Sequence, residues 1–144
     1  MTKSMIHILL VEDDDVDVMT VKRAFRSHKL ANPLHVAKNG VEALAMLRGA
    51  DGTPKLDPLP RIVLLDLNMP KMGGIEFLRE VRADPALRSL SVFVLTTSDH
   101  DSDRVDAYDL NVAGYIIKPV EFPKFVEAVG TLKAFWELCQ HRSD

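Results

Sequence analysis

The chain has 144 residues, of which 47% are hydrophobic and 27% are charged, and its formal net charge is −3. This size and composition predict one globular domain over residues 1–144 and exclude a disordered or fibrous chain, while the scattered Lys and Arg residues argue against a nucleic-acid partner. The apolar runs are far shorter than the roughly 20 residues that span a bilayer, and the single cysteine, Cys139, cannot form an internal disulfide, so we expect a cytoplasmic protein without a membrane partner.

Short apolar runs alternate with segments of helical spacing along the chain. In chain order, the expected strands are residues 6–11, 34–37, 62–65, 91–95 and 114–117. The expected helices run after "EDDD" from Val18 to Phe25, from Val41 to Leu47, from Ile75 to Val81, more loosely from Val105 to Leu110, and at about 121–140. The strands are almost continuously apolar, which indicates parallel strands covered on both faces.

Strand then helix, repeated five times, is typical of an open parallel α/β sheet with helices on both sides. One connection is longer than usual: residues 49–60, "GADGTPKLDPLP", stand where about two to six residues are common. This segment is either a surface insertion that the fold tolerates or a loop that contacts a partner.

Polar side chains follow four of the expected strands, and the carboxyl ends of parallel strands form one edge of a sheet, where ligands bind. These residues are Glu12, Asp13 and Asp14 after the first strand, Asp66 after the third, Thr96 to Ser98 after the fourth, and Lys118 after the fifth. Each has an ordinary explanation by itself, since acidic residues cap helices and aspartate begins turns. If the fold is right, however, these groups converge.

Carboxylates that lie within several ångströms of one another repel strongly and need a cation. Oxygen ligands that are few and open to water suit Mg²⁺, and Lys118 would supply an ammonium. A carboxylate beside Mg²⁺ is a competent nucleophile toward a phosphoryl group. The residues therefore predict that Asp66 becomes an aspartyl phosphate and that the Thr96 hydroxyl approaches it.

The sequence resembles a response-regulator receiver domain over residues 5–130. The matching motifs are "ILLVEDD" (8–14), "IVLLDLNMPKMGG" (62–74), "VFVLTTS" (92–98) and "GYIIKP" (114–119). The resemblance implies a flavodoxin-like three-layer fold with a five-stranded parallel sheet of order 2-1-3-4-5. Because only residues 120–144 follow Pro119, the chain resembles the receivers that act without an output domain.

The resemblance also implies a role for each site residue. Asp66 would be the phosphoacceptor and Lys118 the partner lysine, while Glu12, Asp13, Asp66 and the backbone carbonyl of Asn68 would hold Mg²⁺. Thr96 and Tyr115 would form the switch. The Lys118–Pro119 bond matches a position that is cis in receivers.

The partner expected from the resemblance is a sensor histidine kinase. More narrowly, "ANPLHVAKNGVEAL", the long loop and "LNVAGYIIKPVEF" are similar to the small regulators of bacterial phytochrome kinases. Two other classes compete with this interpretation, an aspartyl-phosphate hydrolase and a receiver-like scaffold that is never phosphorylated. The hydrolase would need a second aspartate where Asn68 stands, and the intact set of site residues argues against the scaffold.

The last helix carries more apolar residues than a covering helix needs. One stripe, from Phe122 to Cys139, advances by threes and fours and would pack on the sheet. Further large side chains lie beside it, so we expect a homodimer interface, formed by Phe122, Val126, Phe135, Trp136 and Leu138. The five histidines show no ligand spacing in the sequence, and Cys139 is interpreted as an apolar contact.

Overall fold

The computed structural model describes residues 6–50, 52–67, 69, 72–96, 105, 109–117 and 122–140, without the side chains at 117, 122, 125, 132 and 135–140. The strands are β1 (Ile8–Val11), β2 (Leu34–Ala37), β3 (Ile62–Asp66), β4 (Ser91–Thr96) and β5 (Gly114–Ile117). The helices are α1 (Asp15–Ser27), α2 (Gly40–Arg48), α3 (Gly74–Ala83) and α5 (Phe122–Gln140). Of the helix expected from Val105 to Leu110, residues 106–108 lie outside the described residues, and the expected end is wrong, because Asp109 is in a turn with φ of 53° and Leu110 is not helical.

All five strands pair in parallel in the order β2-β1-β3-β4-β5, which confirms the predicted fold class and strand order. Strands β3 and β4 each run one residue beyond the predicted end. Asp66 and Thr96 are therefore the last residues of their strands, and Asp66 is in register with Leu95. Two site candidates are thus fixed by the sheet itself and not by a loop.

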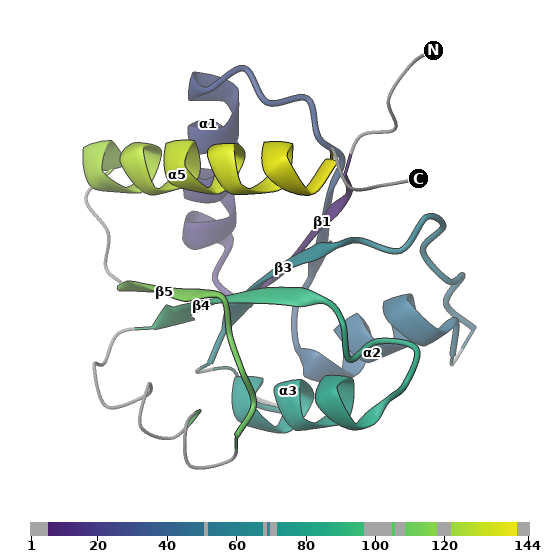
Figure 1. Ribbon diagram of the computed structural model, residues 1–144. Helices are drawn as coiled ribbons and strands as arrows, with labels where there is room; N and C mark the ends of the chain where they lie inside the picture. Colours follow the sequence, from purple (N-terminus) through teal and green to yellow (C-terminus); the bar gives the residue numbers. More distant parts are fainter. Residues whose placement is uncertain are drawn as a thin grey trace.

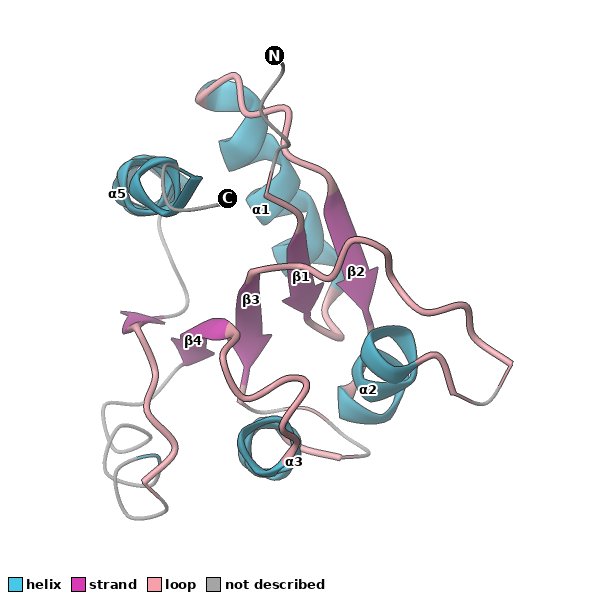
Figure 2. Cartoon of the chain, turned by 45° about the vertical axis from the view of Figure 1, so that its right-hand side comes forward, coloured by secondary structure: helices cyan, strands magenta, loops and turns pink. Residues whose placement is uncertain are grey.

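The helices cover the sheet on both faces, with α1 and α5 on one side and α2 and α3 on the other (Figures 1 and 2). Alternate residues of each strand face the two layers. Leu9 and Val11 of β1 pack with the α2 and α3 side, whereas Ile8 and Leu10 pack with α1 and with Val129 of α5. Each fully buried leucine or isoleucine contributes about 1.5–3 kcal/mol. Among the described residues, no helix has the length and apolar character that a bilayer crossing requires.

Local signals set the ends of α1 and α2 as the sequence indicates. The Asp14 carboxylate accepts a hydrogen bond from the Val16 backbone N–H at 2.8 Å, which caps α1. Asn39 caps α2 by accepting from the Glu42 N–H at 2.9 Å. Gly49 ends α2 with φ of 73°, a left-handed conformation that glycine adopts without a steric penalty.

The long connection after α2 folds back on its own chain. The Leu56 N–H donates to the Met46 carbonyl at 2.9 Å, and Leu59 is partly buried against the core under α2. The Asp57–Pro58 peptide bond is cis. The described part of this connection is therefore held to the rest of the domain at Leu56 and at Leu59.

Arg82, near the end of α3, ties three segments together. Its guanidinium donates to four backbone carbonyls, at distances of 2.6–2.8 Å. Two of these, Arg88 and Leu90, precede β4, and the other two, Leu110 and Asn111, precede β5. Burial lowers the pKa of Arg82, but an arginine remains charged at any physiological pH.

Two histidines that the sequence analysis treated as unrelated form a pair. His7 precedes β1 and His35 lies in β2, and the rings stack with Nδ1 of His7 3.0 Å from Nε2 of His35. Burial, and to a smaller extent His7, lowers the pKa of His35. His35 therefore favours the neutral state at neutral pH, in which its ring can donate or accept the hydrogen bond that joins it to His7.

Candidate functional site

Three carboxylates meet at the carboxyl edge of the sheet. One oxygen from each of Glu12, Asp13 and Asp66 lies within 4.8 Å of the others. Glu12 and Asp13 directly follow β1, and Asp66 ends β3, the strand next to β1. The expectation that these acids converge is confirmed.

Backbone hydrogen bonds hold the first of these acids in place. The Glu12 N–H donates to the Ala37 carbonyl at the end of β2 at 2.9 Å, and Glu12 Oε2 accepts from the Asp14 N–H at 3.2 Å. This second bond links the acidic cluster to the residue that caps α1. The position of Glu12 is therefore set by β2 and by the start of α1 together.

Burial makes this cluster costly without a cation. Glu12 is 0% exposed and Asp66 4% exposed, whereas Asp13 faces solvent. Two ionised carboxylates at 4.8 Å repel by about 3 kcal/mol at an effective dielectric constant of about 20. The donor set contains only oxygen and has one face open to water, which fits a hard divalent ion such as Mg²⁺.

The remaining predicted site residues are only partly described. Thr96 is 1% exposed at the end of β4, the strand next to Asp66, and Tyr115 of β5 lies at the surface. Asn68, Lys118 and the Lys118–Pro119 bond lie outside the described residues. The structure therefore brings Glu12, Asp13 and Asp66 together and puts Thr96 on the adjoining strand end.

Lys38 is a charged residue at this edge that the sequence analysis did not single out. It directly follows β2, and its ammonium forms an ion pair with Asp15, the first residue of α1. The hydrogen bond that the Lys38 ammonium donates to the Asp15 carboxylate raises the pKa of Lys38, with smaller contributions from Glu42 and Asp13. The same rule that selected the ends of the other four strands finds Lys38 when it is applied to β2.

A close approach of α3 to the end of β3 shapes the other side of the site. The Gly74 N–H donates to the Leu67 carbonyl at 3.1 Å. A Cβ atom on Gly74 would lie 2.5 Å from the Leu67 Cα and 2.8 Å from the Asp66 carbonyl oxygen. Only glycine lets the first turn of α3 pack directly against the residue that ends β3.

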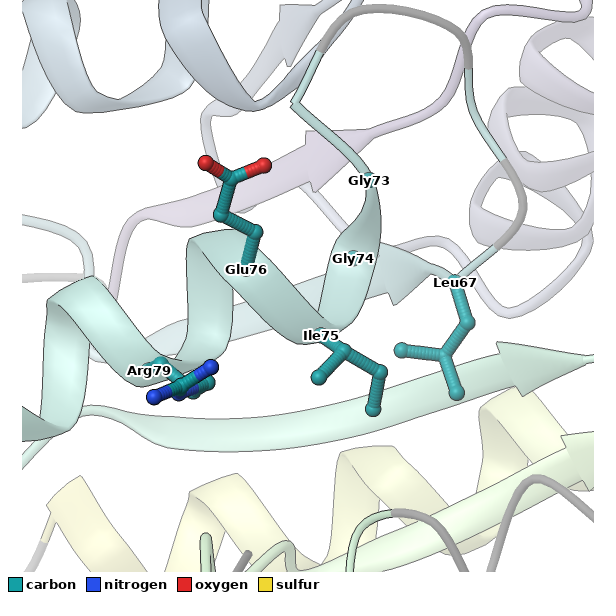
Figure 3. A pocket seen from close by; sticks show the side chains of 6 residues that line it. All are labelled: Leu67, Gly73, Gly74, Ile75, Glu76 and Arg79. Atoms are coloured by element: carbon teal, nitrogen blue, oxygen red, sulfur yellow. The ribbon is translucent and has the colours of Figure 1, made fainter.

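A pocket of about 380 Å³ lies beside this contact, lined by Leu67, Gly73, Gly74, Ile75, Glu76 and Arg79. Figure 3 shows the Leu67 and Ile75 side chains on the same side of the chain, with Glu76 directed away from them. Because Leu67 follows Asp66, the pocket adjoins the acidic cluster through the backbone.

Among the expected dimer residues, only Val126 has a described side chain. It is partly buried against the core on the α1 and α5 side, and its carbonyl accepts a hydrogen bond from a ring nitrogen of His28. The Val126 side chain and carbonyl thus already make contacts within the domain. The side chains of Phe122, Phe135, Trp136 and Leu138 lie outside the described part of the chain.

Comparison with known proteins decides the family. Residues 8–130 match the model of the response regulator receiver domain. The chain belongs to this family. It is a receiver domain of a two-component response regulator, a class that is typically a non-enzymatic signalling protein.

Two curated relatives of this receiver domain align over 129 residues, which is 90% of the chain. The "Probable methanogenesis regulatory protein FilR2" of Methanothrix harundinacea is 39% identical, and the alignment covers 82% of it. "Response regulator Rcp1" of Synechocystis sp. is 34% identical, with 87% of its length covered.

Solved structures of related receivers include phytochrome regulators. The "Bacteriophytochrome response regulator RtBRR" is 40% identical with a TM-score of 0.78, covering 88% of this chain and 77% of that one. The Mn(2+)-bound form of Rcp1 is 32% identical with a TM-score of 0.75, and 94% of each chain is covered. The predicted likeness to regulators of this group is confirmed.

Proposed function

We propose that this receiver domain accepts a phosphoryl group from a histidine kinase on Asp66, in the cytoplasm and in a reaction that depends on Mg²⁺. The observation that carries the proposal is the convergence of Glu12, Asp13 and Asp66 within 4.8 Å, with Asp66 at the end of a central strand. An acid fixed by the sheet beside a cation site is preorganised for in-line phosphoryl transfer.

The transfer step uses groups of this chain. A carboxylate oxygen of Asp66 attacks phosphorus while the bond from phosphorus to the donor histidine nitrogen breaks, and that nitrogen keeps the electron pair. Glu12, Asp13 and the Asn68 carbonyl would hold the metal ion with Asp66. The ion, when bound, neutralises the charge on the transferring oxygens. Lys118 would contact the same oxygens, and Thr96 would donate to one of them.

The output would be a change of docking surface. An aspartyl phosphate adds nearly two negative charges at the end of β3, and contacts that exist only with this group would favour one of two conformations. Thr96 lies on the next strand end and Tyr115 lies at the surface of the following strand, so the two residues could transmit the change together. Several contacts must act jointly, because a population reversal needs about 5.5 kcal/mol.

The kinase partner would be of the phytochrome type, as the names of RtBRR and its relatives indicate for those proteins. The first turns of α1, which begins next to the acidic cluster, carry two exposed apolar side chains. Val16 is 70% exposed and Met19 is 68% exposed. Apolar side chains this exposed suit a docking surface, so a kinase could cover them while it presents its phosphohistidine to Asp66.

Incubation with acetyl phosphate and Mg²⁺, followed by intact mass spectrometry, tests the proposed function. We expect one phosphoryl group per chain, and we expect the gain to disappear when a chelator removes the metal, because the acidic cluster then repels the donor anion. A phytochrome-type kinase loaded with phosphate should transfer it to the same residue. A wild-type chain of unchanged mass both with acetyl phosphate and Mg²⁺ and with the phosphorylated kinase would exclude the proposal.

A homodimer through α5 remains part of the proposal. The helix spans 19 residues and contributes Val129 to the core, while Phe135 and Trp136 supply further apolar groups. We expect light scattering to show a dimer whose fraction rises with protein concentration, and the double variant Phe135→Asp, Trp136→Asp to stay monomeric. A wild type that is still monomeric at high micromolar concentration would contradict this assembly.

A further inference from the structure

The end of β2 lies directly beside the acidic residues that follow β1. Val11 and Ala37 are partners in the parallel register, and the Glu12 N–H donates to the Ala37 carbonyl at 2.9 Å. Lys38 is the next residue on the β2 side. A lysine at this position is therefore adjacent to the acidic cluster, on the side opposite to β4.

Lys38 already has three acidic neighbours. Its ammonium pairs with Asp15, and its backbone N–H donates to Glu42 Oε1 at 3.2 Å. The charge of Asp13 also acts on it and helps to raise its pKa, while the hydrogen bond from Lys38 lowers the pKa of Asp15. At neutral pH both partners of the ion pair are therefore charged.

The ion pair is open to water, which makes it exchangeable. The Lys38 side chain is 48% exposed and that of Asp15 is 81% exposed. Exposed pairs hold their geometry only weakly, so a flexible lysine can move between neighbouring carboxylates at little cost. Asp13 is the solvent-facing acid of the cluster, and an ammonium drawn to it would oppose a divalent ion at the same carboxylate.

We propose that Lys38 is a further cation beside this site, in addition to the metal ion and Lys118, and that Asp15 is a positioning residue that holds the Lys38 ammonium away from Asp13. The pair then sets the affinity of the acidic cluster for the divalent ion. This inference rests on the proposed function, because it assumes that Glu12, Asp13 and Asp66 bind a metal. Metal affinity would then be regulated by Lys38, after β2, and by Asp15 of α1, although β2 and α1 contribute none of the proposed metal ligands.

Titration with Mn²⁺, followed by electron paramagnetic resonance of the free ion, tests the proposal on the full chain, with Mg²⁺ as the competitor. Lys38→Met should bind Mn²⁺ about threefold more tightly, because one opposing charge is removed. Lys38→Arg keeps the charge and should match the wild type. The gain in Lys38→Met should shrink in about 1 M salt, where the screening length falls to about 3 Å.

The variant Asp15→Asn distinguishes an effect of positioning the Lys38 ammonium from an effect of net charge on Mn²⁺ binding. We expect it to weaken Mn²⁺ binding about threefold, since the freed ammonium turns to Asp13. Asp17→Asn is the matched control, because it removes the same charge from the same helical turn and should have a smaller effect. In the Lys38→Met background, the effect of Asp15→Asn on Mn²⁺ affinity should be as small as that of Asp17→Asn, since no ammonium remains to be released.

Each result decides between the two proposals. Unchanged or weaker Mn²⁺ binding in Lys38→Met, or equal effects of Asp15→Asn and Asp17→Asn, would overturn the role of the pair while leaving the metal site intact. A wild type that binds no Mn²⁺ would overturn the metal site and this inference with it. Circular dichroism of each variant verifies that these substitutions, at the exposed Lys38 and Asp15 and the partly exposed Asp17, leave the fold unchanged.

Discussion

Asp66→Asn is expected to abolish phosphoryl uptake, from one group per chain to none. Asparagine keeps the shape of the side chain at the end of β3 but lacks the anionic oxygen that attacks phosphorus. Intact mass after treatment with acetyl phosphate and Mg²⁺ measures this directly. Asp17→Asn, an acidic residue of α1 outside the three-carboxylate cluster, serves as the control and should retain full uptake.

The same substitution also reports on the cluster. Removing one of three crowded carboxylates lowers their mutual repulsion, so the folded protein should tolerate Asp66→Asn without loss of stability. Loss of uptake would then come from chemistry and not from unfolding. If Asp66→Asn still gained a full phosphoryl group, the acceptor would have to be a different residue, and peptide mapping of the labelled chain would identify it.

Gly74→Ala is expected to destabilise the fold by about 3 kcal/mol, at the upper end of the usual cost of overpacking. The new methyl group would stand 2.5 Å from the Leu67 Cα and 2.8 Å from the Asp66 carbonyl oxygen. Both neighbours are backbone atoms, so α3 must move away from β3. Chemical denaturation followed by circular dichroism measures the change in the free energy of unfolding.

The neighbouring glycine gives the matched control. A Cβ atom on Gly73 would find its nearest atoms at 3.8 Å, an ordinary contact, and the residue has φ of −65°. Gly73→Ala should therefore cost about 1 kcal/mol at most, the usual preference for glycine over alanine at a helix N-cap, and clearly less than Gly74→Ala. Equal effects of the two substitutions would show that close packing at Gly74 is not the cause.

The order of elements and the site acids were predictable from local patterns. Near-continuous apolar strands that alternate with helical spacing permit few folds other than an open parallel sheet, and the residue that follows each strand is then known to face the carboxyl edge. The neighbourhood of Glu12, Asp13 and Asp66 was therefore predictable, and so was that of Lys38, which follows β2 at the same edge.

Other contacts have no local signal. His7 and His35 meet because β1 pairs with β2 in one particular register. Arg82 reaches four carbonyls on two loops whose distance from α3 cannot be read along the chain. The periodicity of a segment shows which face is buried but not which distant residue lies opposite, so these partners appear only once the strands are in register.

The sequence by itself determined the layered α/β architecture, the strand positions to within one or two residues and the acidic character of one edge, because burial of apolar strands and helix capping are local properties of residues. Tertiary structure decided the 4.8 Å grouping of the carboxylates, the ion pair of Lys38 with Asp15 and the fit of α3 at Gly74. Those depend on register and close packing between segments far apart in the chain, where a shift of one residue would separate the same side chains.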